Sequence, residues 1–418
     1  MISQIEALNY RCLEYIKQPL GPFHVLVGPN ASGKTTFLDV IAFLGQVVSD
    51  GPKEAIENRT VNFSDLLWQR QGTRFELAIE VRIPPELKDK LDDSSLDTVR
   101  YEVAVGVEEV SSEVGLLAEK VFLLRAEEKV PLERTLFPDD HLPPATILHN
   151  RKKTWRTIIS KAPQGNDTFT PEIKVHSKKS WSPSFKLGHR KSALGNLPPD
   201  ESKFPVSTWL RDLLDNGVQP FILNSLLLRQ PSPPYQRRRF KSDGSNLPWI
   251  VDPFKKKHPD QFKNWIRHIQ SALPEVQDVL VHSRKEDNHS YLSVVYPNDL
   301  RVPSWMVSDG TLRLLAMTLP AYLPDFQGIY LIEEPENGIH PKAVETVFQS
   351  LSSVYDAQIL LASHSPVILS IAEPEQVLCF AKTEAGATDI VLGSEHPQLR
   401  DWKGETNLGT LFAAGVLG

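Results

Sequence analysis

The chain has 418 residues, of which 40% are hydrophobic and 23% charged, and its formal net charge is −6. This composition is typical of a soluble globular protein with one to three domains, and it excludes a surface that is basic throughout. No stretch approaches the about 20 consecutive apolar residues that a membrane-spanning helix needs. The two cysteines, Cys12 and Cys379, have neither metal-site spacing nor the number for a disulfide framework, so we expect a reduced, cytoplasmic protein.

The N-terminal part reads as short strands around one glycine-rich loop. Strands are predicted at 2–7 and 12–16, followed by a buried strand, the loop and an apolar helix. Residues 74–83 alternate between hydrophobic and polar side chains, which is typical of a half-buried antiparallel strand. The same alternation at 99–108, and a further strand at 119–126, predict an antiparallel β part over residues 86–130.

The middle of the chain changes in composition from about residue 130, where Pro, Ser, Lys and Arg become frequent and periodicity weakens. Two amphipathic helices stand out, at 206–218 and 262–273, because their large apolar residues recur at helical spacing. We therefore expect residues 131–299 to form an inserted, mainly helical and loop region.

Strong signals return in the C-terminal part. They predict helices at 310–321 and 341–354, buried strands at 329–332 and 358–363, and a closing hairpin that turns at 384–386. Together with the N-terminal part, these elements predict a discontinuous domain built from residues 1–85 and 300–418.

The segment GPNASGKTT, Gly28 to Thr36, matches the G-x-x-x-x-G-K-[ST] pattern between an apolar strand and a helix. Glycines let backbone N–H groups wrap phosphates, a lysine reaches the β- and γ-phosphates, and the following hydroxyl is a Mg²⁺ ligand. The pattern alone predicts a nucleoside triphosphate and Mg²⁺ as cofactors. The expected nucleotide-binding residues here are Gly28, Asn30, Ala31, Ser32, Gly33, Lys34, Thr35 and Thr36.

Two adjacent carboxylates end the apolar strand in IYLIEEPENG, Ile329 to Gly338. A phosphate-loop protein needs a carboxylate near its Mg²⁺, and Glu333 at the strand end fits that role beside Thr35. Glu334, one residue later, points elsewhere and could activate a water for attack on the γ-phosphate. The alternative is that both are solvated charges at a strand end.

Further motifs follow in a fixed order. VSDGTLRLLAM, 307–317, precedes the carboxylates by about one helix, and LASHSP, 361–366, follows them. This order resembles the phosphate loop, signature, Walker B, D-loop and switch histidine of ABC-type ATPases. It is most similar to the RecF, OLD and SMC-like branch, which includes small bacterial AAA-type ATPases of phage-defence operons. The resemblance implies an α/β fold like an SMC head, with a mixed core sheet, an antiparallel β subdomain and an inserted region.

The resemblance also implies roles for single residues. Glu333 stands where aspartate is usual and would hold the metal, whereas Glu334, His364 and Lys34 would serve catalysis. The remaining implied positions are Arg11 at the nucleotide, Ser308, Asp309, Gly310 and Thr311 in the signature that acts on a partner subunit, and Glu336 and Asn337 in the D-loop. Gln69 and Gln71 are both Q-loop candidates, and each could equally be a polar residue at a strand edge.

These roles imply an ATPase that dimerises head-to-head on ATP, as a homodimer or a higher even oligomer. We expect the ATPase and sensor subunit of an anti-phage defence complex that controls a separate effector, a nuclease or toxin. The alternative is a RecF-like clamp ATPase of DNA repair. A transporter subunit is disfavoured by the SDGT signature and the long insertion. Only 54 residues follow His364, too few for a Toprim domain, so we expect no nuclease activity in this chain.

Basic clusters interleaved with aromatic residues occur in the middle region. The clearest is QRRRFK, 236–241, which makes Arg237, Arg238, Arg239 and Lys241 candidate contacts to DNA or RNA phosphates. HNRKKTWR, 149–156, and KKKH, 255–258, are weaker examples. The alternative for all three is solvated loop charge.

Overall fold

The structure is a computed structural model that describes residues 1–108, 111–125, 136–139, 142–150, 152, 154–161, 164–173, 182–198, 200–236, 240–324 and 327–397. The first of its sheets is antiparallel throughout, with the order β2-β1-β4-β5-β6-β7-β8-β9. Its strands are β1 (Ile2–Tyr10), β2 (Leu13–Pro19), β4 (Arg74–Arg82), β5 (Thr98–Val107), β6 (Val114–Leu124), β7 (Arg156–Lys161), β8 (Asp167–Phe169) and β9 (Ser184–Phe185).

A second, mixed sheet has the order β10-β14-β15-β3-β16-β17, in which only the β16–β17 pair is antiparallel. This sheet confirms the mixed core sheet that the sequence predicted. Its strands are β3 (Phe23–Val27), β10 (Val218–Phe221), β14 (Gly328–Glu333), β15 (Ala357–Ala362), β16 (Val377–Lys382) and β17 (Thr388–Leu392).

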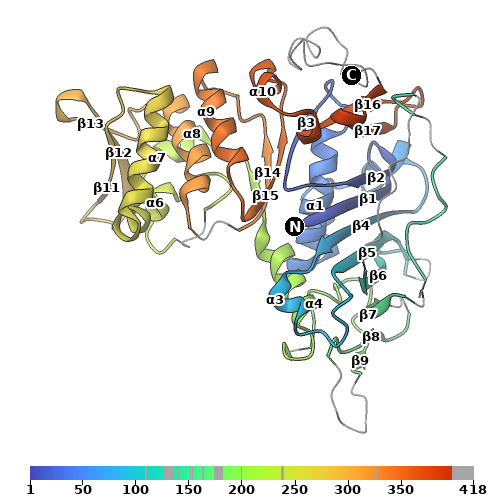
Figure 1. The fold of residues 1–418 in the computed structure, drawn as a ribbon. Coiled ribbons are helices and arrows are strands. Elements are labelled where there is room, and N and C mark those ends of the chain that lie inside the picture. The colour runs from blue at the N-terminus through green and yellow to red at the C-terminus, as the bar shows by residue number, and fades with distance from the viewer. Residues whose placement is uncertain are drawn as a thin grey trace.

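A third, small sheet, β11-β12-β13, forms a separate lobe with helices α6 to α9, on the left in Figure 1. Its strands are β11 (Asp278–Ser283), β12 (Ser290–Tyr296) and β13 (Leu300–Pro303). The α-helices of the described residues are α1 (Lys34–Ser49), α2 (Pro52–Glu57), α3 (Pro85–Lys88), α4 (Pro205–Asp212), α5 (Ser225–Arg229), α6 (Leu247–Lys257), α7 (Pro259–Ala272), α8 (Asp309–Thr318), α9 (Pro341–Ser352) and α10 (Pro366–Ile371).

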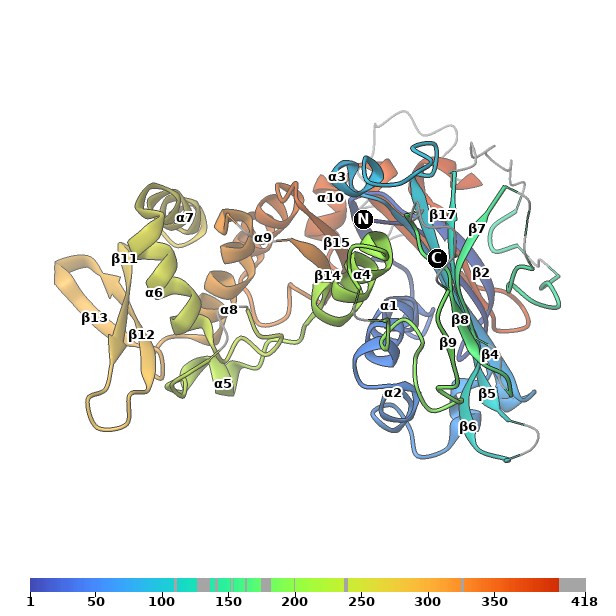
Figure 2. The ribbon, with the colours of Figure 1, turned by 90° about the horizontal axis from the view of Figure 1, so that it is seen from below.

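The mixed sheet is buried on both faces, which explains its nearly continuous apolar strands. Along β14, Ile329 and Leu331 pack into a core with α1 and the antiparallel sheet, whereas Tyr330 and Ile332 pack into a second core with α6 to α10. Helix α1 thus lies between the two large sheets, as the view from below shows (Figure 2). This layering brings the start of α1 to the carboxyl ends of β3, β14 and β15.

The structure differs in detail from the sequence-based expectations. The helix predicted at 206–218 ends at Asp212 and continues as a π-helical turn, Leu213–Gly217, that leads into β10. The region 131–299 also contributes β7 to β9 to the antiparallel sheet, through short strands with little alternation. The predicted domain boundaries therefore do not coincide with breaks in this sheet, and the division into domains stays a prediction. Within the described residues, no helix combines the length and apolar character needed to cross a membrane.

Candidate nucleotide-binding site

The phosphate loop joins β3 to α1 and follows the backbone path that its glycines allow. Gly28 has φ 147° and Gly33 has φ 106°, in the region that favours glycine. A Cβ on Gly28 would collide with the Phe380 carbonyl, and one on Gly33 with the Thr388 hydroxyl. The loop therefore needs glycine at these positions both for its conformation and because the β16–β17 hairpin lies against it.

Lys34, at the start of α1, turns its ammonium group back over the loop. Its Nζ donates to the carbonyl oxygens of Gly28, at 2.9 Å, and of Pro29, at 2.8 Å. Burial lowers the pKa of Lys34, and the charges of Glu334 and Glu333 oppose that shift. A cation held only by backbone carbonyls at a cavity wall can exchange these partners for phosphate oxygens.

The two carboxylates reach the same place from a distant part of the chain. Strand β14 runs parallel to β15, and β15 to β3, so Glu333 emerges at the edge where the phosphate loop begins. The hydroxyl of Thr35 donates to Glu333 Oε2 at 2.5 Å, between residues 298 positions apart. The longer side chain of glutamate therefore reaches the position expected of a metal ligand beside Thr35.

Glu334 takes a different direction from Glu333. It has φ 47°, a left-handed conformation that non-glycine residues adopt rarely and often at functional sites. Its N–H donates to the Ala362 carbonyl at 2.8 Å, and its carboxylate accepts a hydrogen bond from the Asn337 side-chain amide. Both carboxylates are exposed to solvent.

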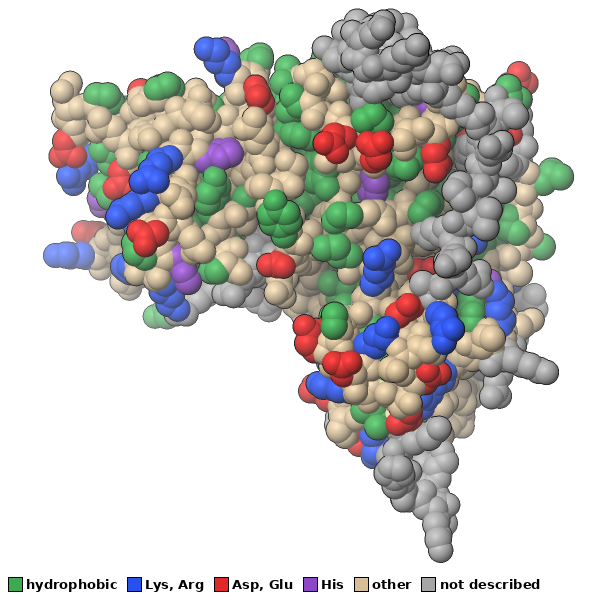
Figure 3. Space-filling view, in the orientation of Figure 1, with side chains coloured by type: hydrophobic (Ala, Val, Ile, Leu, Met, Phe, Trp, Pro, Cys, Tyr) green, Lys and Arg blue, Asp and Glu red, His purple; other side chains and the backbone are tan. Residues whose placement is uncertain are grey.

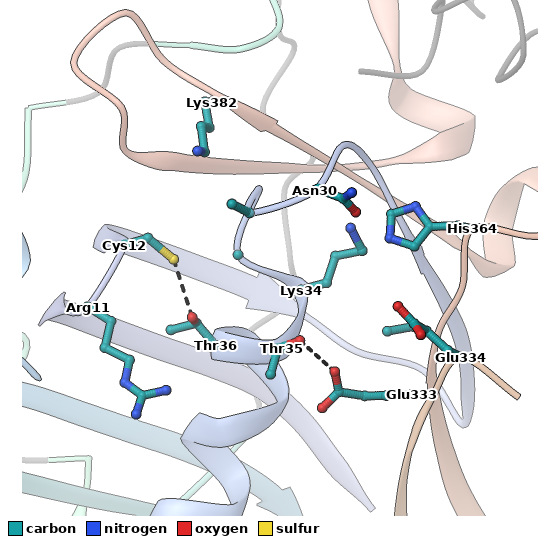
Figure 4. Close-up of a pocket in the computed structure, with 13 residues that line it drawn as sticks. Arg11, Cys12, Asn30, Lys34, Thr35, Thr36, Glu333, Glu334, His364 and Lys382 are labelled. Atoms are coloured by element: carbon teal, nitrogen blue, oxygen red, sulfur yellow. Dashed lines mark hydrogen bonds between the residues drawn. The ribbon is translucent and has the colours of Figure 1, made fainter. Parts of the chain in front are cut away.

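A cavity of about 440 Å³ collects these groups (Figure 4). Ten of the predicted residues line it: Arg11, Asn30, Ala31, Gly33, Lys34, Thr35, Thr36, Glu333, Glu334 and His364. Gly28 and Ser32 belong to the same loop but do not line the cavity. Sequence reasoning missed Cys12, Ala362 and Lys382, which also line it.

The donor set fits Mg²⁺ and a nucleotide. Mg²⁺ is usually held by one or two carboxylates together with phosphate oxygens and waters, rather than by a cage of protein ligands. Thr35 and Glu333 supply a hydroxyl and a carboxylate at one point, and the described residues contain no cluster of three or more His, Cys, Asp or Glu side chains that could hold a metal. These two residues would therefore hold the ion, with the phosphates completing its shell.

Arg11 lies at the tight turn between β1 and β2, on the opposite side of the cavity from His364 (Figure 4). It has φ 53°, and its N–H donates to the Leu66 carbonyl at 2.9 Å. Its guanidinium lies 3.3 Å from an Asp39 carboxylate oxygen. This geometry places a positive side chain at the cavity wall, and contact with a nucleotide stays a prediction.

The predicted D-loop is joined to the loop that carries His364. Glu336 Oε1 accepts from the Ser363 hydroxyl at 2.9 Å and from the His364 N–H at 2.8 Å. Asn337 contacts Glu334, as described above. The D-loop residues therefore fix the backbone around the two catalytic candidates, Glu334 and His364, within one subunit.

The predicted signature does not line the cavity. Ser308 caps α8 by accepting from the Thr311 N–H at 3.2 Å, and Asp309 pairs with Arg229 at 2.6 Å. A Cβ on Gly310 would lie 2.9 Å from the Gly338 carbonyl oxygen, so the helix start packs directly on the D-loop turn. Ser308 and Asp309 are exposed to solvent.

The predicted Q-loop residues do not line the cavity, and neither does the predicted nucleic-acid-binding residue that the structure describes. Gln69 and Gln71 are exposed and do not line it, so neither Q-loop assignment gains support from the structure. Arg237, Arg238 and Arg239 lie outside the described residues, and Lys241 is exposed.

The other basic clusters are partly paired within the protein. Lys255 bonds to the Asp278 carboxylate and Lys256 to Asp252, and Lys152 lies over the Trp155 ring. On the face shown in Figure 3, basic and acidic side chains are interspersed. Nucleic-acid binding stays a prediction.

A stretch of 41 residues is 51% identical to the OLD nuclease of Thermus scotoductus (strain ATCC 700910 / SA-01). The stretch makes up 10% of this chain and only 8% of that nuclease.

Two solved structures resemble the chain over most of its length. One is an Smc head bound to the C-winged helix domain of ScpA, with TM-score 0.54, 13% identity, and coverage of 93% of this chain and 96% of that one. The other is an Smc head domain with an extended coiled coil, bound to the C-terminal domain of ScpA derived from Pyrococcus furiosus. Its TM-score is 0.52 at 12% identity, with coverage of 93% and 95%. At such identity the likeness concerns the fold, and it confirms the predicted SMC-head-like architecture.

A family profile described as "AAA domain, putative AbiEii toxin, Type IV TA system" matches residues 23–370. That span contains the phosphate loop, the signature, both carboxylates and His364, and it leaves out only Arg11 among the cavity residues predicted from sequence. The chain therefore belongs to this family of AAA domains.

Proposed function

We propose that the chain binds ATP with Mg²⁺ in the 440 Å³ cavity and hydrolyses it, acting as a molecular switch. The observation that carries the proposal is the 2.5 Å contact between Thr35 and Glu333. This contact joins the phosphate loop to the carboxylate strand although 298 positions separate them in the chain. A fold that brings the two halves of a Mg²⁺ and phosphate site together is what nucleotide hydrolysis requires.

Five of the cavity residues then have assigned roles. Lys34 holds the β- and γ-phosphates after leaving the Gly28 and Pro29 carbonyls, and Thr35 with Glu333 would hold the metal. Bound Mg²⁺ supplies positive charge against the phosphate oxygens. Glu334 orients a water for in-line attack and accepts its proton, while His364, from the β15 end, contacts the γ-phosphate.

We extend the proposal to a head-to-head homodimer in which the signature completes the partner's site. The support is that Ser308 lies exposed at the first turn of α8, away from its own cavity. The N-terminus of a helix carries partial positive charge and free N–H groups, which suit a γ-phosphate. Gly310 packs on the D-loop, and the D-loop holds Glu334 and His364, so a partner's nucleotide could affect both.

The substitution Glu334→Gln tests the catalytic part. General-base catalysis contributes about 10²- to 10⁴-fold, so we expect hydrolysis to fall within that range while ATP binding persists. The variant should accumulate as an ATP-bound dimer, measured by light scattering beside phosphate release. Glu345→Gln, an exposed glutamate on α9, is the matched control and should behave as the parent. Hydrolysis at the parent rate would refute the base assignment, and a monomer with bound ATP would refute the dimer.

For the biological role we propose the ATPase and sensor subunit of an anti-phage defence complex, with a nuclease or toxin as a separate partner. The family description names a toxin–antitoxin system, and the 41-residue match is to a nuclease of the OLD type. In the native host, Lys34→Ala should abolish protection against phage and leave sensitivity to DNA damage unchanged. The reverse pattern would favour the RecF-like repair clamp.

A further inference from the structure

We infer that Lys382 binds the α-phosphate of the nucleotide, with its ammonium group at the end of the cavity opposite Glu334. The inference rests on the proposed ATP site and adds a contact from the C-terminal hairpin, which no sequence motif marks. It rests on three observations: the path of β16, the attachment of the hairpin to the phosphate loop, and the charges that surround Lys382.

Strand β16 has two neighbours, β3 and β17, and it extends beyond the end of β3. It runs parallel to β3 as far as the pair Cys379 and Val27, where β3 ends and the phosphate loop begins. The last three residues of β16 therefore run beside the loop. Phe380 packs edge-on against Phe37 of α1, with ring centroids 5.6 Å apart. Because side chains two apart in a strand share a face, Lys382 points to the same side, toward the start of α1.

The hairpin is attached to the loop at its base, so Lys382 has a defined place. Thr388 is the ladder partner of Lys382, and its hydroxyl donates to the Ser32 carbonyl at 2.9 Å. The Thr388 N–H donates to the Cys12 carbonyl at 3.0 Å. These buried bonds hold β17, and with it Lys382, against both the phosphate loop and the β1–β2 turn.

The position of Lys382 matches the α-phosphate end of the site. Glu333, Glu334 and His364 mark the γ-phosphate end. Figure 4 shows Lys382 above the loop, on the side of Cys12 rather than of the two glutamates. Cys12 Sγ lies 3.4 Å from Thr36 Oγ1, so this side adjoins the residue that follows Thr35. The N–H groups of such a loop cradle the α- and β-phosphates, which leaves the α-phosphate nearest to Lys382.

The charge of Lys382 is available to a ligand. Its side chain is exposed and lines the cavity, and none of the ion pairs found among the described residues includes it. Arg11, the other cation at this end, already has Asp39 beside it at 3.3 Å. A lysine ammonium is a compact charge on a flexible stem, suited to a single phosphate rather than to bidentate binding.

The test is the pair of dissociation constants for ATP and ADP in Lys382→Ala. Both nucleotides carry the α-phosphate, so both constants should rise by the same factor, about five- to tenfold. Lys382→Arg keeps the charge and should restore most of the affinity.

Lys17→Ala is the control, since Lys17 is also an exposed strand lysine but does not line the cavity. Thermal unfolding without nucleotide should be the same for all these variants. Unchanged constants in Lys382→Ala would overturn the inference, as would weakening of ATP alone, which would place Lys382 at the γ-phosphate. If the parent chain bound neither nucleotide, the proposed function itself would fail.

Discussion

In two places in the molecule, carboxylates from distant parts of the sequence lie around one cation. In one place the charges face a cavity, and in the other they pair with one another. One is the nucleotide cavity, with Lys34, Glu333 and Glu334. The other lies on the antiparallel sheet, where Arg100 of β5 bonds to Glu102, Glu6 and Glu80 at 2.6, 2.7 and 3.1 Å. We call these four residues the Arg100 cluster.

The Arg100 cluster is closed. The Arg100 side chain is only 2% exposed, and all three of its nitrogens have carboxylate partners. Burial lowers the pKa of Arg100, but Glu102 and Glu6 outweigh it and raise the pKa above its ordinary value. His149, from the loop that covers this face, bonds to Glu102 through Nδ1 at 2.6 Å.

The cavity, in contrast, is open. Its two glutamates are exposed, and the ammonium group of Lys34 bonds to backbone carbonyls instead of carboxylates. Charges that satisfy one another inside a protein stabilise or specify the fold, whereas charges left facing a cavity can bind a ligand. The partners of the cation alone therefore distinguish the closed Arg100 cluster from the open cavity that we propose binds ATP.

The largest effect is expected from breaking the closed cluster. In Arg100→Met, buried carboxylates lose their counter-charge, and such changes typically cost about 3–5 kcal/mol. We expect the free energy of unfolding to fall by that amount, measured by denaturant titration, while nucleotide affinity of the folded fraction stays unchanged.

A triple variant makes the Arg100 test sharper. Combining Arg100→Met with Glu6→Gln and Glu102→Gln removes the two most buried of the three uncompensated charges and leaves Glu80, so part of the lost stability should return. Arg301→Met is the control, since the Arg301–Asp299 pair is exposed and its loss should cost under about 1 kcal/mol. If Arg100→Met were as stable as the parent, burial and ion pairing would not distinguish the Arg100 cluster from the cavity.

The sequence predicted the charged residues of the cavity but not the Arg100 cluster, for a physical reason. A phosphate loop has fixed local spacing, so Lys34 and Thr35 are recognisable without any tertiary information. Glu6, Arg100 and Glu102 alternate with apolar residues along their strands, a pattern that normally marks a solvent face. They are buried because residues 142–150 cover them, where the Ile147 carbonyl accepts from Arg100, and that segment has no periodicity.

The same reasoning explains which parts of the site were found. Motif order placed Glu333, Glu334 and His364, because each ends or follows a strand that is apolar enough to recognise. Lys382 and Cys12 escaped notice because they reach the cavity only through the pairing of β16 with β3 and through the β1–β2 turn. No local pattern encodes a pairing such as that of β16 with β3, which joins segments hundreds of residues apart.

A smaller effect, on the ATP affinity of the cavity alone, is expected from Thr35→Val. Valine keeps the shape but removes the hydroxyl that meets Glu333, so the Mg²⁺ contribution to ATP affinity should fall by about 1–2 kcal/mol, roughly five- to thirtyfold. The measurement is the dissociation constant of ATP with Mg²⁺ and with EDTA. The parent should lose affinity in EDTA, and Thr35→Val should lose much less.

Thr36→Val is the matched control for Thr35→Val, since the Thr36 hydroxyl meets Cys12 and not Glu333. It should keep the parent's Mg²⁺ dependence. The stability of Thr35→Val without nucleotide should stay within about 0.5 kcal/mol of the parent, because the Thr35–Glu333 contact is exposed and surface changes cost little. A destabilisation comparable to that of Arg100→Met would mean that the cavity, too, is held closed by its own charges. If Thr36→Val lost the Mg²⁺ dependence instead, the assignment of the metal to Thr35 and Glu333 would be wrong.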